Sequence, residues 1–276
     1  MSKRRIDLRG KRILVTGASS GIGRELALAL AGKGAVPAVA ARRQELLDRL
    51  ADEISDAGSA RPIVLRADLA DPGAATDLGA RAQEALGGVD IVINNAGANL
   101  TGAQSSVADS EAARRVFEVN VWSPLALTAA LLPAMHAAGS GMIVNVTSTV
   151  QAVPLPLLGY YAASKAALAQ ATRSLRLELA ETPIRVVEVV PGSTDTALRD
   201  IDELPWKTSP PRTAPPVSPA ATAAAVVRAL QRGATRVVYP SYSLVPLEVP
   251  AIGRLVATIG GRRVNTLGAL DLEGNR

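Results

Sequence analysis

Tyr161 and Lys165 are the residues whose types and spacing most directly suggest catalysis in this sequence. They lie four positions apart in Tyr161-Ala-Ala-Ser-Lys165, at the start of a segment whose pattern predicts a helix over 161–179, and side chains at i and i+4 share one helix face. A tyrosine phenol has a pKa of about 10, too high to exchange a proton readily at neutral pH. A nearby ammonium stabilises the phenolate and lowers that pKa. The pair is therefore a candidate acid–base group, although an exposed helix pair of these types is common when it stands alone.

A second chemical feature is the glycine-rich turn Thr16-Gly-Ala-Ser-Ser-Gly-Ile-Gly23, between a predicted strand over 12–16 and a predicted helix over 24–31. Glycines at 17, 21 and 23 permit a tight turn, close approach of a diphosphate and close helix–strand packing. The free N–H groups and the dipole of a helix N-terminus favour an anion at the same place. The spacing G-x-x-x-G-x-G differs from the usual dinucleotide pattern G-x-G-x-x-G, so the turn alone does not separate a phosphate site from an ordinary tight turn.

The same residues also fit G-x-S-x-G, the nucleophile elbow of α/β-hydrolases, with Ser19 as the nucleophile. The base of such a triad has to be His136, because the chain contains one histidine. His136 lies within a predicted helix and upstream of further strands, whereas the histidine of a hydrolase comes late, after the acid. A serine hydrolase acting through Ser19 is therefore the alternative rather than the favoured interpretation.

The composition limits the classes of protein to which the chain can belong. Of its 276 residues, 48% are hydrophobic and 20% are charged, which allows a sizeable core and excludes general disorder. The absence of cysteine excludes disulfide scaffolds and thiolate sites, and with one histidine we expect no metal. The net charge is +5, but the basic residues are scattered among acids without interleaved aromatics, so we expect no nucleic-acid partner. No signal peptide follows the basic start and no apolar run reaches the ~18 residues of a membrane span, which predicts a cytoplasmic protein.

The elements that must position these residues alternate along the chain. Strands are predicted over 12–16, 36–41, 63–65, 89–93, 142–146, 184–190 and 236–239. Helices are predicted over 24–31, 44–57, 122–138, 161–179 and 219–232, with an Ala-rich helix between the third and fourth strands. Repeated strand–helix units whose strands are apolar throughout predict a parallel sheet covered on both faces. We therefore expect one doubly wound α/β domain, with a proline-rich loop over 197–218.

Further motifs occur in a fixed order along the chain. With the glycine turn they are Asp68 after the third strand, Asn94-Asn95-Ala96-Gly97, Asn120 in Phe-Glu-Val-Asn-Val, Ser148 thirteen residues before Tyr161, and Pro191-Gly192. In this combination the sequence resembles the short-chain dehydrogenase/reductase family over roughly residues 9–240. The resemblance implies a Rossmann-type catalytic domain over 1–240 with a seven-stranded parallel sheet, a substrate loop at 197–218, and a C-terminal extension over 241–276 packed on the domain or on a partner.

The resemblance also implies how the catalytic residues act. Tyr161 would protonate the carbonyl oxygen during reduction, or act as the base in the reverse direction. Lys165 would lower the tyrosine pKa and hold the nicotinamide ribose. Ser148 would hydrogen-bond the substrate oxygen, and Asn120 would anchor a water that leads protons to Lys165.

A nicotinamide cofactor follows from the same resemblance, and charge favours NADP(H) over NAD(H). An NAD enzyme of this type carries an acid at the end of the second strand to hold the 2′-hydroxyl. Here Ala41 stands at that position and Arg42 and Arg43 follow it, which suits a 2′-phosphate; Arg42, the nearer, is the preferred residue. The cofactor-binding residues implied are Gly17, Ser19, Ser20, Gly21, Ile22, Gly23, Arg42, Arg43, Asp68, Leu69, Asn95, Ala96, Gly97, Tyr161, Lys165, Pro191, Gly192, Thr194 and Thr196.

The substrate is predicted to be a small, largely apolar carbonyl compound or alcohol. Three segments are expected to meet it: residues 98–107, the residues after Ser148, and the loop over 197–218. They contain many apolar residues, and the first two contain no cluster of basic residues. The candidate contacts are Gln151, Leu155, Leu198 and Trp206. The family usually forms homodimers or homotetramers. A non-catalytic NADP(H)-binding regulator of the same fold is the other alternative, but a mere sensor needs no proton relay.

The tail beyond residue 240 carries a separate pattern. Ile252, Leu255, Val256 and Ile259 fall on one face of a helical period, with Arg254 among them and Arg262-Arg263 after them. Such a stripe can lie on an anionic membrane. We expect it instead to pack on its own domain or on a neighbouring subunit.

Overall fold

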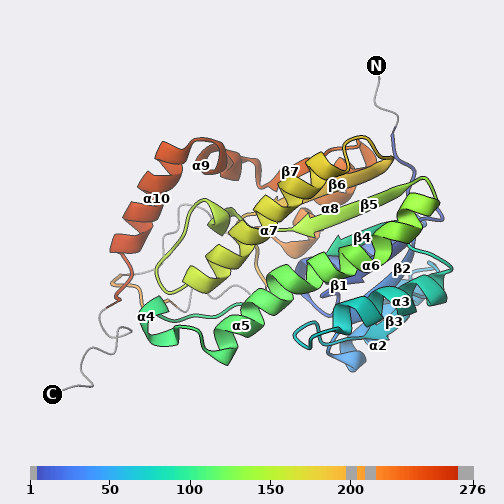
Figure 1. Ribbon diagram of the computed structural model, residues 1–276, viewed down its shortest axis with the longest axis horizontal. Helices are drawn as coiled ribbons and strands as arrows, with labels where there is room; N and C mark the ends of the chain where they lie inside the picture. Colours follow the sequence, from blue (N-terminus) through green and yellow to red (C-terminus); the bar gives the residue numbers. More distant parts are fainter. Residues whose placement is uncertain (1–4, 197–203, 209–215, 267–276) are drawn as a thin grey trace.

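One parallel sheet organises the molecule (Figure 1). The computed structural model describes residues 5–196, 204–208 and 216–266. Within these ranges seven strands pair in the order β3-β2-β1-β4-β5-β6-β7, which confirms the predicted fold class. They are β1 (Arg12–Thr16), β2 (Val36–Ala41), β3 (Ile63–Arg66), β4 (Ile91–Asn94), β5 (Gly141–Val146), β6 (Ile184–Pro191) and β7 (Arg236–Tyr239). The strand order reverses between β1 and β4, and in sheets of this kind the carboxyl ends at that switch point are where ligands bind.

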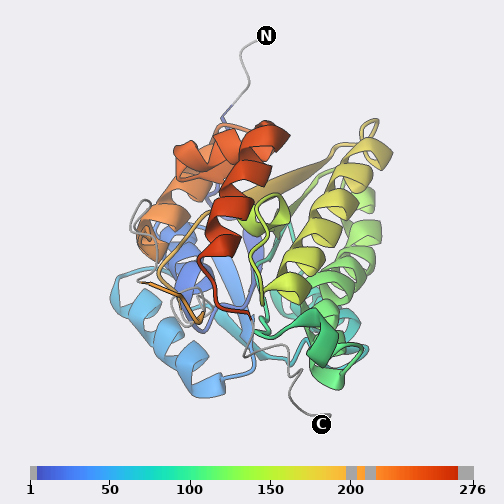
Figure 2. The ribbon, with the colours of Figure 1, turned by 90° about the vertical axis from the view of Figure 1, so that its left-hand side faces the viewer.

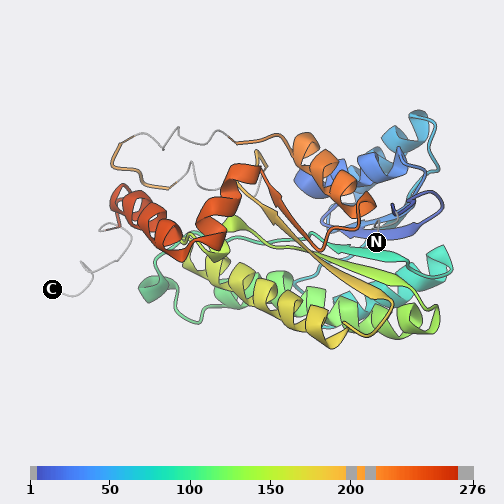
Figure 3. The same ribbon diagram turned by 90° about the horizontal axis from the view of Figure 1, so that it is seen from above.

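Helices cover the sheet in two layers (Figures 2 and 3). One face carries α1 (Gly21–Ala31), α2 (Gln44–Asp56) and α8 (Pro219–Gln231). The other carries α3 (Ala74–Leu86), α6 (Ser123–Ala137) and α7 (Gly159–Glu178). Because the central strands are buried on both faces, most of their side chains are apolar without alternation, as in β5, where five of six residues are buried and Asn145 is the polar one among them.

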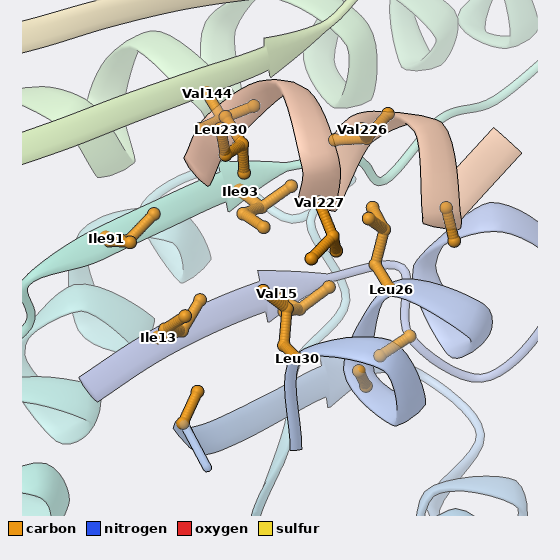
Figure 4. Packing of buried hydrophobic residues seen from close by; sticks show 14 of the residues in the cluster. Ile13, Val15, Leu26, Leu30, Ile91, Ile93, Val144, Val226, Val227 and Leu230 are labelled. Carbon is orange, nitrogen blue, oxygen red and sulfur yellow. The ribbon is translucent and has the colours of Figure 1, made fainter. Parts of the chain in front are cut away.

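The first of these layers shows how the core is filled (Figure 4). Ile13 and Val15 of β1 point toward Leu30 of α1, and Val226 and Val227 of α8 complete the layer. All five side chains have at most 2% of their surface exposed. Aliphatic side chains thus do the packing that aromatic residues, only 3% of the chain, cannot supply.

The helix predicted over 122–138 is longer than its pattern suggests. After α4 (Gln104–Val107), helix α5 (Glu111–Phe117) passes through η1 (Glu118–Trp122), a π-helical turn, directly into α6. The continuous helix Glu111–Ala137 contains an 18-residue window of mean hydropathy 1.3, so the expectation that no segment is long and apolar enough to span a membrane was wrong. Its inner side packs on α3 and β5, and 44% of that window is buried within the molecule.

The C-terminal segment folds as η4 (Ser241–Ser243), α9 (Leu244–Glu248) and α10 (Pro250–Arg262). Gly253 is the buried residue of α10, whereas Ile252, Leu255, Val256 and Ile259 are all exposed. The expectation that this stripe packs on its own domain was therefore wrong. Packing on another subunit stays a prediction.

The glycine turn brings β1 against the end of β4. Gly17 has φ +66°, and a Cβ atom there would lie 2.7 Å from Cα of Ala96. Gly58, at the end of α2, also has a left-handed φ of +81° but has nothing within 4 Å of that point. Both glycines therefore need a left-handed backbone, and Gly17 in addition leaves no room for a Cβ atom beside Ala96.

We expect Gly17→Ala to destabilise the protein by about 2–5 kcal/mol, since a left-handed alanine costs ~1–2 kcal/mol and overpacking adds ~1–3 kcal/mol. Gly58→Ala, which has the same backbone strain without the contact, should lose only about 1–2 kcal/mol. Urea unfolding of both variants measures the difference. Equal losses would contradict the close approach.

Candidate active site

A cavity of about 680 Å³ opens at the carboxyl ends of the strands. Its wall is built from residues at or just after the ends of β1 to β6, which is the region of the switch point. Most of the predicted site residues line it: Gly17, Ser19, Ser20, Gly21, Ile22, Arg42, Arg43, Asp68, Leu69, Asn95, Ala96, Gly97, Ser148, Tyr161, Lys165, Pro191, Gly192, Thr194 and Thr196. Segments far apart in the sequence therefore meet in one place.

Hydrogen bonds from Thr16 join β1 to β4 at the base of the cavity. The Thr16 hydroxyl donates to the carbonyl of Ile93 and accepts from the N–H groups of Asn95 and Ala96, both at 3.0 Å. The Asn95 amide donates in return to the carbonyl of Thr16, also at 3.0 Å. A Cβ on Gly23 would lie 2.4 Å from Asn95 Nδ2. Gly23, which does not line the cavity, is thus required for packing of the turn on Asn95.

The start of α1 presents hydrogen-bond donors to the cavity. Its N-cap residue, Ser20, makes no side-chain cap to the first turn, so an anion is the natural partner of the N–H groups there. Arg43 donates from Nη2 to the hydroxyls of Ser19 and Ser20, both at 2.9 Å. The guanidinium therefore lies against the glycine turn. The geometry favours Arg43 over Arg42, the residue that the sequence suggested, as the closer cation at this turn.

A small ion-pair cluster closes the same side of the cavity. Asp68 receives a 2.9 Å bond from Nη2 of Arg115, and Arg42 Nη1 lies 4.0 Å from the same carboxylate. The N–H of Ala70 also donates to Asp68 at 3.0 Å. Together with Arg43 and Lys165, these two arginines give the cavity wall four cationic side chains, whereas Asp68 is its one carboxylate. This balance suits a ligand with several negative charges.

Tyr161 and Lys165 lie on the cavity face of α7, as their spacing predicts. Lys165 Nζ lies 5.9 Å from the centroid of the Tyr161 ring and donates to the carbonyl of Val146 at 3.0 Å. Only 2% of Lys165 is exposed. Burial lowers the pKa of Lys165 to about 8, because the charged ammonium loses its hydration. The protein thus holds a buried cation close to a phenol at the cavity wall.

Asn120 does not line the cavity but lies directly behind it. It sits in the π-helical turn η1 and is fully buried. Its side chain accepts from the N–H of Ala98 and donates to the carbonyl of Ala98, both at 2.8 Å, and it donates to the Ser164 hydroxyl at 2.9 Å. Asn120 therefore fixes the loop after β4 against the helix that carries Tyr161.

The predicted substrate residues lie outside the cavity wall as far as the structure describes them. Gln151 ends η2 (Thr149–Gln151) and donates to the buried carboxylate of Glu188 at 3.2 Å. Leu155 and Trp206 instead join a separate apolar cluster, which reaches the cavity through Leu158. Leu198, and with it the middle of the predicted loop, lies outside the described residues.

The alternative nucleophile has no base near it. Ser19 follows the carboxyl end of β1, whereas His136 is exposed in the last turn of α6, just before β5 begins. Strands of a parallel sheet begin and end at opposite edges, so the two side chains lie at opposite edges of the sheet. The Ser19 hydroxyl accepts from Arg43 instead.

Three residues of the site were missed from the sequence. They are Thr16, which joins β1 to β4, Ser164, which holds Asn120, and Arg115, which pairs with Asp68. Ser164 lies three residues after Tyr161, so the helical period offered a signal for it. Nothing local indicated Arg115, because its partner is 47 positions away.

Comparison with known proteins gives a consistent result. The model of the family described as short chain dehydrogenase matches residues 11–203. A rat protein named dehydrogenase/reductase SDR family member 7B is 38% identical over 197 residues, covering 69% of this chain and 60% of that protein. The chain thus spans under two thirds of that relative's length. Ketoacyl reductase HetN from a Nostoc species is 31% identical over 273 residues, 98% of this chain and 93% of the relative.

Solved structures share the architecture. A short-chain dehydrogenase from Sphingobium yanoikuyae in complex with NADPH is 28% identical and superposes with a TM-score of 0.75, covering 90% of this chain and 95% of that one. A short-chain dehydrogenase/reductase from Burkholderia phymatum in complex with NAD, 22% identical, has a TM-score of 0.78 over 95% of this chain and 99% of that one. The second likeness bears on the fold alone.

The buried Lys165 should leave a signature in the pH dependence of stability. Its pKa is about 8 in the folded protein and 10.5 as the ordinary value, so between these values the unfolded chain binds more protons and stability rises with pH. The cost of burying the ammonium is complete below pH 8 and disappears as the pH rises through 10.5. We expect the stability of Lys165→Met relative to wild type to fall by about 2 kcal/mol between about pH 7 and about pH 9.5.

Chemical denaturation of the cofactor-free proteins at several pH values measures this difference. Lys33→Met, at an exposed lysine, is the matched control and should show no such trend. A Lys165→Met curve parallel to wild type would show that the native ammonium is not desolvated.

Proposed function

Because this chain belongs to the short-chain dehydrogenase/reductase family, we propose that it is an oxidoreductase that interconverts a carbonyl and an alcohol with NADP(H). The observation that carries the proposal is a convergence: Tyr161, Lys165 and Ser148 line the same cavity as the glycine turn and Arg43. Such a reaction requires acid–base groups, a site for the cofactor phosphates, and space between the two. The bound dinucleotide would supply or accept the hydride.

The residues of the cavity fit a dinucleotide. The uncapped N-terminus of α1 would hold the diphosphate, with the absence of side chains at the glycines allowing its approach. Asn95, Ala96 and Gly97 would border the adenosine ribose, Asp68 and Leu69 the adenine. Pro191 to Thr196 would border the nicotinamide end, where Gly192 and Thr194 also line the cavity.

Selectivity for a 2′-phosphate is supported by the end of β2. Ala41 rather than an acid ends β2, and Arg43 is held 2.9 Å from both hydroxyls of Ser19 and Ser20. A phosphate placed between these groups would receive charge-assisted hydrogen bonds from Arg43 and, after a small reorientation, from Arg42. NADH, which lacks this phosphate, would leave Arg43 with the two serine hydroxyls and Arg42 with the Asp68 carboxylate.

The catalytic roles follow from the placement of each side chain. Tyr161 would donate its proton to the carbonyl oxygen in reduction and take it back in oxidation. The ammonium of Lys165, kept close by its bond to the Val146 carbonyl, would stabilise the phenolate that remains. Ser148 would donate a hydrogen bond to the same substrate oxygen. Asn120, hydrogen-bonded to Ala98 and Ser164, would hold the loop after β4 and the start of α7 in a fixed relative position.

An apolar substrate is supported by the part of the wall beyond these groups. Leu100, Val150 and Leu158 line the cavity there, and no cation stands among them. Leu158 belongs to an apolar cluster with Leu155 and Trp206, so those two predicted residues would shape the wall from behind. A ketone with an alkyl, acyl or terpenoid body fits this surface better than a sugar or a dicarboxylate.

A non-catalytic regulator of the same fold would keep the dinucleotide site but have no use for the proton relay. The presence of Ser148, Tyr161 and Lys165 in one cavity favours the enzyme.

The cofactor proposal predicts selective binding of NADPH. We expect wild type to bind NADPH at least about tenfold more tightly than NADH, since hydrogen bonds to charged groups contribute ~1.5–3 kcal/mol. Arg43→Ala should bring the NADPH affinity close to that for NADH, and Arg42→Ala should have a smaller effect. Fluorescence titration and thermal shift with both cofactors measure this.

Arg49→Ala is the matched control, because Arg49 is an exposed arginine on α2 that does not line the cavity. Equal affinities of wild type for the two cofactors would refute the selectivity. Binding of neither would refute the oxidoreductase and make hydrolysis through Ser19 the next hypothesis to test.

The acid–base proposal predicts that Tyr161→Phe lowers kcat for ketone reduction by roughly 10²–10⁴-fold, the usual contribution of a positioned acid. NADPH affinity should change little, because the ring remains in place. Oxidation of NADPH in the presence of alkyl ketones, followed by absorbance, measures kcat. Tyr160→Phe, on the neighbouring residue that bonds the Ala108 carbonyl, is the control for loss of a hydroxyl. An unchanged kcat in Tyr161→Phe would remove Tyr161 from the mechanism.

A further inference from the structure

Exposed apolar side chains are concentrated at one place on the molecule. Of the ten large hydrophobic residues that are exposed among the described residues, eight lie between 242 and 259: Tyr242, Leu244, Val245, Val249, Ile252, Leu255, Val256 and Ile259. Seven of them belong to η4, α9 and α10, and Val249 lies between the two α-helices; this segment stands at one end of the molecule (Figures 1 and 3). The segments Ser241–Glu248 and Pro250–Arg262 are bent by 103° against each other and together are apolar enough for a membrane span. We call these eight residues the tail surface.

The orientation of α10 is fixed by small residues on its inner side. A Cβ on Gly253 would lie 2.6 Å from the Pro246 carbonyl and 3.2 Å from that of Ala152, and one on Gly260 would lie 3.0 Å from Leu155. Backbone bonds hold the end of the helix: Lys207 donates to Arg263 and Asn265 donates to the Pro205 carbonyl, at 2.8 and 2.7 Å. A rotation that buried the tail surface against the domain would break all of these contacts. The exposure is therefore built into the packing.

The charges on α10 and directly after it all have one sign. Arg254 and Arg262 are exposed on α10, and Arg263 follows them. From Val249 to Thr266 the sequence contains no acid, and Glu248 is paired with Arg236. Apolar side chains next to exposed arginines are the composition of helices that lie in the surface of an anionic bilayer.

We propose that the tail surface binds a bilayer that contains negatively charged phospholipids, with the apolar side chains in the acyl boundary and the arginines at the headgroups. A second copy of the chain fits less well. In a two-fold interface the same patch meets itself, so Arg254 and Arg262 would meet a segment whose one acid, Glu248, is already paired with Arg236. The other two exposed hydrophobic residues, Trp122 and Leu177, lie on different helices, η1 and α7.

The helix that carries most of the tail surface also packs, on its inner side, close to the wall of the cavity. The inner side of α10 contacts Leu155, and Val264 after it packs in the apolar cluster that contains Leu158, a residue of the cavity wall. If the proposed function holds, an apolar substrate dissolved in the bilayer would have a short path to the site. Lipid binding itself does not depend on that function.

The test is co-sedimentation of the full chain with vesicles. Wild type should bind vesicles of phosphatidylcholine with about 30% phosphatidylglycerol several-fold more strongly than phosphatidylcholine alone. Leu255→Gln/Ile259→Gln should lower the partition coefficient at least roughly tenfold on both, because the apolar contact is lost. Arg254→Gln/Arg262→Gln should lower it roughly tenfold on the anionic vesicles only.

Leu177→Gln is the matched control, since Leu177 is 78% exposed on another face, and it should bind like wild type. Thermal unfolding confirms that each variant is folded. Binding of wild type no greater than background, or equal loss in Leu177→Gln, would overturn the proposal. So would a lipid-free dimer that dissociates in Leu255→Gln/Ile259→Gln by sedimentation velocity, because the tail surface would then be covered by a second copy. None of these readouts involves catalysis, so their failure leaves the proposed function standing.

Discussion

The contact between the turn after β1 and the end of β4 is the constraint on which the site depends. Gly17 and Gly23 have no side chains, so Asn95 can lie within about a hydrogen-bond distance of the turn, and Thr16 joins the two strand ends with its hydroxyl. The position of this contact, which we call the seam, sets the positions of the other parts of the cavity. The start of α1 points its N–H groups into the space above it, and the loop after β4, held by Asn120, forms the opposite wall. Larger side chains at either glycine would separate β1 from β4 and displace both walls together.

Buried polar groups behind this seam form a second set of contacts that hold the site together. Asn94 donates to Asn145 at 2.8 Å, and Asn145 donates to the Thr172 hydroxyl at 2.9 Å, which links β4, β5 and α7 under the site. Lys165, on the same helix α7, donates to the backbone carbonyl of Val146, and no carboxylate among the described residues pairs with it. A buried ammonium in such surroundings is costly. Burial lowers the pKa of Lys165 only to about 8, so at neutral pH the side chain is still mainly the ammonium that lies close to the Tyr161 ring.

The sequence allowed most of this arrangement to be predicted because the signals were local. The seven strands were short, largely apolar runs, the glycine turn had its own spacing, and Tyr161 and Lys165 were about one helical turn apart. What could not be predicted depended on partners distant in the chain. Arg115 meets Asp68 across 47 positions, and Gln151 turns away from the cavity because the buried carboxylate of Glu188 attracts its amide. The π-helical turn at Asn120 is likewise fixed by bonds to Ala98 and Ser164 rather than by its own residues.

Helix α10 shows why the rule that apolar stripes face inward failed at the tail. The rule assumes that the large side chains offer the best packing, but here the helix approaches the backbone at Pro246 and Ala152 so closely that only Gly253 fits between them. Because the side of α10 that carries Gly253 faces the domain, Leu255 and Ile259 face outward. Full burial of such side chains stabilises a protein by ~1.5–3 kcal/mol each, and the isolated chain forgoes that gain at several adjacent positions. Stability of the monomer therefore does not account for large apolar residues at these positions, whereas the proposed contact with a bilayer would.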